Sequence, residues 1–154
     1  MKYVLLLFAF TGLLNQSAKA QTKKETINWL IEKMTRYGIH IYPEDTTGKI
    51  NKSTFSRGTI DYEEVFDLKM VYGYTIWKDY PTGLNMREGV GNVLLRVRDN
   101  GISIHNFNNN ANDSESLVLL VVNWDGEANL AQRFQKALND LVAFNKANTP
   151  KEAY

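Results

Sequence analysis

The chain has 154 residues, with 18 Lys and Arg against 17 Asp and Glu, and it contains no cysteine. A net charge near zero without a basic block argues against nucleic acid as a partner, because phosphate binding needs clustered positive charge. The lack of cysteine excludes disulfides, thiolate chemistry and a lipid-anchored cysteine. No basic amphipathic segment is present, which argues against binding to anionic membrane surfaces.

The first 20 residues have the pattern of a secretory signal peptide. Lys2 supplies a positive start, residues 4–14 are almost entirely apolar, and the small residues Ala18 and Ala20 form a signal peptidase site. We therefore predict cleavage after Ala20 and a mature chain that begins at Gln21. The apolar stretch is too short for a helix across a bilayer core of about 30 Å. We expect a soluble, secreted or periplasmic protein that makes no stable membrane insertion after the signal is removed.

The mature chain is expected to be one domain. Residues 21–148 have the length of a single globular unit, and the Thr149-Pro150 pair predicts a flexible tail over residues 149–154. Removal of the signal, which carries two lysines and no acid, would change the net charge from +1 to −1. A secreted domain without disulfides must be stabilised by its hydrophobic core.

A helix is predicted near the start of the mature chain. Thr22 and Glu25 have the spacing of a capping box, in which each side chain binds a free backbone amide of the other residue. The apolar residues that follow at helical spacing are Ile27, Leu30, Ile31 and Met34. We therefore predict a helix over residues 23–37 that ends in a left-handed cap at Gly38.

Short apolar or alternating segments, separated by turn residues, predict antiparallel strands in the middle of the chain. The predicted strands are residues 39–42, 50–55, 59–66, 68–77, 93–98 and 102–107. Residues 79–91 are expected to form a long loop. Residues 108–116 are rich in Asn, Asp and Ser, and we expect them to form a mobile loop.

The Asn-Gly dipeptide at residues 100–101 lies between two alternating runs. This arrangement is typical of a two-residue β-hairpin turn, because both central residues can adopt a positive φ. The resulting register would place Val97 opposite Ile104, facing the core, and Arg96 opposite His105, facing outward.

The last third of the chain predicts a buried strand followed by a helix. Residues 117–122 are an unbroken apolar run, so we expect both faces of this strand to be covered. An amphipathic helix packed on the sheet is predicted from the apolar stripe of Leu130, Phe134, Ala137, Leu138 and Leu141. The order of helix, antiparallel strands and helix predicts an α+β fold with a curved sheet or a partly open barrel.

This order resembles the PH-like superfold of small secreted bacterial domains of unknown function. The resemblance is carried by residues 60–65 (Ile60-Asp61-Tyr62-Glu63-Glu64-Val65), by the turn at residues 100–101, and by the apolar run at residues 117–122 that leads into a terminal helix. It implies a binding or scaffold module rather than an enzyme, although function must be argued from a site.

Recognisable catalytic and metal-binding motifs are absent from the sequence. His40 and His105 are far apart, and neither belongs to a ligand pair such as His-x-His. The chain has no Gly-x-Ser-x-Gly elbow and no P-loop lysine. Glu63 and Glu64 would point to opposite faces of a strand, so acid catalysis on a glycoside near Asp61 is the least favoured alternative. We predict no catalytic residue, no cofactor and no metal.

Four aromatic residues form the strongest candidate for a ligand surface: Tyr72, Tyr74, Trp77 and Tyr80. Strand alternation would place Tyr72 and Tyr74 on one face and Trp77 on the other. If exposed, these side chains would suit stacking on sugars or anchoring a protein partner. Otherwise, they would pack within the sheet, because aromatic residues favour strands generally.

The leading functional hypothesis is therefore a secreted or periplasmic, non-catalytic binding or scaffold domain. Its partner would be an unknown protein, a glycan or a small apolar ligand. The alternative is a carrier that holds a small apolar ligand between the sheet and the C-terminal helix. A filled core under that helix favours the first hypothesis, an apolar cavity of a few hundred Å³ favours the carrier, and a polar cleft with facing acids favours an enzyme.

Overall fold

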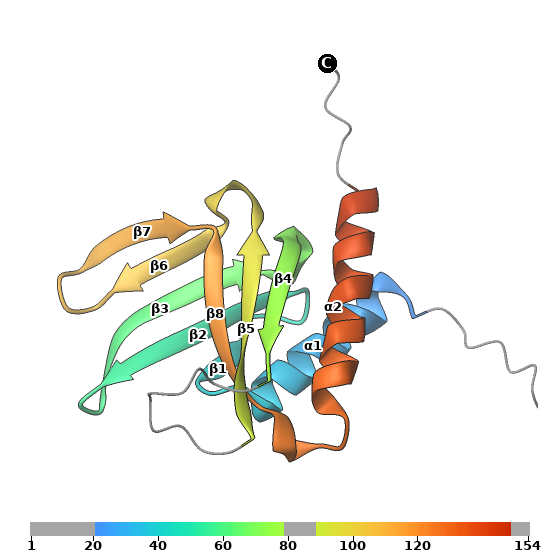
Figure 1. The fold of residues 1–154 in the computed structure, drawn as a ribbon. Helices are drawn as coiled ribbons and strands as arrows, with labels where there is room; N and C mark the ends of the chain where they lie inside the picture. Colours follow the sequence, from blue (N-terminus) through green and yellow to red (C-terminus); the bar gives the residue numbers. More distant parts are fainter. Residues whose placement is uncertain (1–20, 79–88, 149–154) are drawn as a thin grey trace, which may run out of the picture.

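The computed structural model describes residues 21–78 and 89–148. The predicted signal peptide, Tyr80 and the predicted tail lie outside these residues. The described part is an α+β domain with two helices and two antiparallel sheets that do not close into a barrel (Figure 1). The helices are α1 (Lys23–Tyr37) and α2 (Leu130–Ala147). They pack against each other, and α2 also packs against β4.

Eight strands form the two sheets within the described residues. They are β1 (Ile41–Pro43), β2 (Lys49–Ser56), β3 (Thr59–Asp67), β4 (Val71–Trp77), β5 (Val90–Val97), β6 (Ile102–Asn106), β7 (Ala111–Glu115) and β8 (Leu117–Asn123). The larger sheet has the order β1-β2-β3-β6-β7, and the smaller sheet has the order β4-β5-β8. In Figure 1 the smaller sheet crosses in front of the larger one, and β4 is its strand nearest α2.

The predicted first helix is confirmed, together with its capping box. The Glu25 amide donates to Thr22 Oγ1 at 3.2 Å, and the Thr22 amide donates to Glu25 Oε2 at 2.7 Å. The left-handed cap predicted at Gly38 is wrong, because this residue has a φ of −78°. A glycine is nevertheless required there, since a Cβ would collide with the Met34 carbonyl oxygen and the Ile41 side chain.

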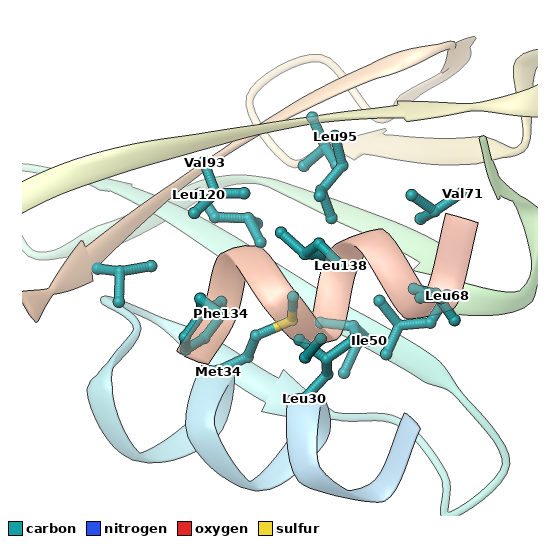
Figure 2. Packing of buried hydrophobic residues seen from close by; sticks show 14 of the residues in the cluster. Leu30, Met34, Ile50, Leu68, Val71, Val93, Leu95, Leu120, Phe134 and Leu138 are labelled. Atoms are coloured by element: carbon teal, nitrogen blue, oxygen red, sulfur yellow. The ribbon is translucent and has the colours of Figure 1, made fainter. Parts of the chain in front are cut away.

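The hydrophobic core lies between the two sheets and the two helices (Figure 2). Phe134 and Leu138 of α2 are fully buried, as the apolar stripe predicts. Fully buried residues from every layer meet them: Leu30, Met34, Ile50, Leu68, Val71, Val93, Leu95 and Leu120. The predicted amphipathic helix packed on the sheet is therefore confirmed.

The predicted hairpin at residues 100–101 is wrong. β5 pairs with β4 and β8, whereas β6 pairs with β3 and β7, so the two strands belong to different sheets. His105 consequently lies opposite Glu63 and not opposite Arg96. Asp99 and Asn100 do adopt positive φ values of 55° and 50°. The sequence therefore predicted a turn correctly, but this turn connects a strand of one sheet to a strand of the other.

Two expectations for the segment that leads into α2 are also wrong. Residues 108–116 contain β7, a polar and fully exposed edge strand, where a loop was expected. The run at residues 117–122 is covered on one face only. Leu117 and Leu119 are 47% and 39% exposed, because β8 is an edge strand and its second face meets no other layer among the described residues.

The ends of two other predicted strands differ from the structure. Residues 68–70 form a 3₁₀ turn capped by the Asp67 side chain, which accepts from the Lys69 amide at 2.8 Å, so β4 begins at Val71. The first strand spans Ile41–Pro43, because His40 adopts a φ of 55° and breaks the extended backbone before it. The remaining strand predictions agree with β2, β3, β5 and β6 within a few residues.

Candidate functional site

A groove runs between β4 and α2, with a volume of about 490 Å³. The strand side consists of residues 72–76 and Lys78, and the helix side consists of Gln135, Asn139, Val142 and Lys146. We call this feature the tyrosine groove, because Tyr72 and Tyr74 both line it. Figure 1 shows the two walls next to each other, with β4 as the last strand of its sheet.

The helix wall follows from the periodicity of α2. The residues that line the groove are spaced by four, three and four positions, so they form one stripe on the helix surface. This stripe lies beside the apolar stripe that packs into the core. Asn145 fixes the helix against the start of β4, because its buried Nδ2 donates to the carbonyl oxygens of Leu68 at 2.9 Å and Val71 at 2.7 Å. The position of the helix wall is therefore set by the core and by a buried amide.

Tyr74 connects the two walls of the groove. Its hydroxyl lies 2.7 Å from Asn139 Oδ1 and 3.2 Å from the Gln135 carbonyl oxygen, and it can donate to either acceptor. Burial raises the pKa of the Tyr74 hydroxyl above its usual value. Tyr72 occupies the register shift between β4 and β5 and is 39% exposed. One tyrosine is thus held in place while the other is free to contact a ligand.

No strand of the described part of the chain pairs with the outer edge of β4. The Val97 amide donates to the Ser116 carbonyl oxygen at 2.8 Å, which shows that the odd-numbered residues of β5 bond to β8. The even-numbered residues of β5 therefore bond to Gly73, Thr75 and Trp77 of β4. By alternation, the backbone groups of Tyr74 and Ile76 point away from β5 and toward the groove. Such an edge can pair with a further strand.

The groove has positive ends. Lys78 and Lys146 line it, and none of the described residues that line it is acidic. Lys146 and Tyr72 also line an adjoining surface hollow, together with Arg98 and Asp99. The ion pair between Lys136 and Asp140 on the helix, at 2.8 Å, is not part of the lining. The groove therefore favours a ligand with negative charge.

The structure divides the predicted aromatic cluster. Tyr72 and Tyr74 line the groove together, whereas Trp77 is 42% exposed and does not line it. The pairing of Tyr74 with the buried Leu95 and of Trp77 with Asn92 places these two aromatics on opposite faces, as predicted. Tyr80 lies outside the described residues. The helix stripe was missed by the sequence analysis, although its four-three-four spacing was visible in the sequence.

The acidic residues do not form a pair near Asp61. Glu64 lies on the core side of β3 in a buried ion pair with Lys52, while the adjacent Glu63 points to the opposite face. Asp61 accepts a hydrogen bond from Asn108 at 3.2 Å and does not line the hollow that contains Glu64. That hollow also contains Asp113 and Glu115 from the exposed strand β7.

Each of the two histidines packs against a different phenylalanine ring. The ring centroids of His40 and Phe55 are 4.4 Å apart, and those of His105 and Phe107 are 4.5 Å apart. His105 Nδ1 also shares a hydrogen bond of 2.8 Å with Asn112 Oδ1. Within residues 21–78 and 89–148, no group of three His, Asp or Glu side chains has the geometry of a metal site.

The space under α2 is occupied by side chains. Phe134 and Leu138 are fully buried in the same core cluster as Leu95 and Leu120 (Figure 2), and Leu141 is fully buried as well. The Phe134 ring makes edge-to-face contacts with Trp29 and Trp124, each with ring centroids 5.4 Å apart. The region that an apolar ligand would occupy in the carrier hypothesis is therefore packed with protein.

Comparison with known proteins gives no relative from which a role could be transferred. No family model matches the chain, and no curated protein or solved structure matches it significantly. Neither helix of the described part is long and apolar enough to cross a membrane. The functional argument must therefore come from the groove itself.

Proposed function

We propose that the protein is an exported, non-catalytic binding domain whose partner binds in the tyrosine groove. The observation that carries this proposal is the combination of three features around one open volume: an edge of β4 that pairs with no described strand, an exposed Tyr72 and a fixed helix wall. Grooves of this size with a few well-placed polar groups are typical binding sites. Export is proposed from the amino-terminal pattern described above, and the PH-like resemblance stays a prediction.

The alternative function, carriage of an apolar ligand between sheet and helix, has less support. A carrier needs an empty apolar volume, and the side chains of Phe134 and Leu138 fill the corresponding region. An exposed tyrosine beside amide and lysine side chains suits a polar partner better.

Site-specific photo-crosslinking in the organism that encodes the chain tests the proposed function. A photoreactive phenylalanine analogue would replace Tyr72 in the groove or, as a control, Tyr42, which is 48% exposed on the larger sheet. We expect a discrete adduct from position 72 and none from position 42. Gln135→Trp should abolish the adduct by filling the groove, while Gln132→Trp, outside the groove on the same helix, should preserve it. Equal adducts at both positions, or an adduct insensitive to Gln135→Trp, would contradict the proposal.

A further inference from the structure

We propose that the partner in the tyrosine groove is an acidic polypeptide segment, bound in an extended conformation as an additional strand beside β4. This inference rests on the proposed function and specifies the chemical class of its partner. It depends on three properties of the groove: its backbone edge, its length and its charge.

The backbone edge supplies the main binding groups. Tyr74 and Ile76 each present an amide and a carbonyl to the groove, and no hydrogen bond within residues 21–78 and 89–148 uses these four groups. An extended peptide would satisfy them by continuing the order β4-β5-β8 by one strand. A glycan would contact the edge at isolated points but could not reproduce the regular spacing of a strand.

The two walls have matching lengths. Residues 72–78 extend over about 20 Å at about 3.3 Å per residue. The helix stripe from Gln135 to Lys146 extends over about 17 Å at 1.5 Å per residue. The groove therefore accommodates about six residues of extended chain, and alternate side chains of that segment would face Gln135, Asn139 and Val142 on the helix.

The charge selects an acidic segment. Lys78 lies at the end of β4 and Lys146 near the end of α2, and none of the described residues that line the groove carries a carboxylate. A segment with acidic side chains would be attracted to the groove, whereas a basic segment would be repelled. We expect the attraction to weaken with salt, since both lysines are exposed.

Selection from a displayed library of random ten-residue peptides against purified residues 21–154 tests the inference. We expect the selected peptides to be enriched in Asp and Glu, and to bind at least about tenfold more weakly to the double variant Lys78→Glu, Lys146→Glu, a loss of about 1.4 kcal/mol. The double variant Lys23→Glu, Lys24→Glu changes two lysines outside the groove and should leave binding unchanged. Selected peptides without acidic enrichment, or an equal effect of both double variants, would overturn the inference.

Backbone pairing is tested with the selected peptide itself. N-methylation at alternate positions removes the amides that would pair with β4, and it should abolish binding without any change to the protein. N-methylation at the intervening positions should have little effect. If both methylated forms bind like the parent peptide, strand addition is wrong. A glycan that binds at Tyr72 and is blocked by Gln135→Trp would overturn the peptide inference while preserving the proposed function.

Discussion

Replacement of Phe134 by alanine tests the packing that positions the helix wall of the groove. The Phe134 ring is fully buried and lies edge-to-face against both Trp29 and Trp124 at 5.4 Å. Truncation of a buried phenylalanine costs about 3–5 kcal/mol through lost transfer energy and an unfilled cavity. Each aromatic pair adds about 0.5–1.5 kcal/mol, so we expect a cost in the upper half of this range.

Urea denaturation of residues 21–154, followed by tryptophan fluorescence, measures this cost. Because the total stability of such a domain is about 5–15 kcal/mol, the midpoint of Phe134→Ala should fall strongly. Phe107→Ala is the matched control: that ring is 48% exposed, and its loss should cost less than about 1 kcal/mol. A Phe134→Ala cost no larger than that of the control would refute the described packing of α2.

Three further predictions concern polar groups. Glu127 accepts from the nearly buried Lys33 at 2.7 Å, so Glu127→Gln should lower the free energy of unfolding by about 1–3 kcal/mol in urea denaturation, and an unchanged midpoint would contradict the ion pair. Asn145→Ala removes a buried donor from two carbonyl oxygens and should cost about 2 kcal/mol by the same assay, whereas no loss would show that these bonds do not hold the helix. The pKa of Asp45 is lowered to about 2, and the hydrogen bond from the Thr47 amide is the largest cause. The ionised Asp45 carboxylate should therefore stabilise the fold above about pH 4, and this contribution should be lost as the pH falls through about 2. NMR titration of the carboxyl carbon would measure this value, and a pKa near 3.8 would contradict the turn geometry.

The parts of the fold that depend on local sequence were predictable. The capping box at Thr22 and Glu25 determines where α1 begins, because both of its hydrogen bonds join residues three apart. The apolar stripe centred on Phe134 likewise identified the buried face of α2. In each case the interactions that define the element lie within a few residues of each other in the sequence.

Strand pairing was not predictable from the same kind of signal. The turn at residues 99–100 has the expected positive φ values, but a turn does not specify whether the next strand pairs with the previous one or enters another sheet. β7 carries no apolar alternation, because an exposed edge strand buries neither face. The exposure of Leu119 was missed for a related reason. An apolar run shows that the side chains are hydrophobic, but whether each face of the strand is buried depends on which other layers pack against it.

The candidate site was partly predictable. Aromatic enrichment identified Tyr72 and Tyr74, and alternation separated them correctly from Trp77. The helix wall was missed because the polar stripe that contains Gln135 and Asn139 lines a groove only when α2 lies beside the edge of β4. That juxtaposition joins residues more than 60 positions apart, as the Tyr74–Asn139 hydrogen bond shows.

Hydrogen exchange at the amides of β4 tests the binding groove most directly. In the free protein, the amides of Tyr74 and Ile76 should exchange at least about tenfold faster than that of Thr75, since they point away from β5. When the crosslinked or selected partner is bound, these two amides should become protected while exchange in β7 stays unchanged. Uniform exchange along β4 in the free protein, or protection by the partner at β7 or β8 in place of β4, would contradict the account.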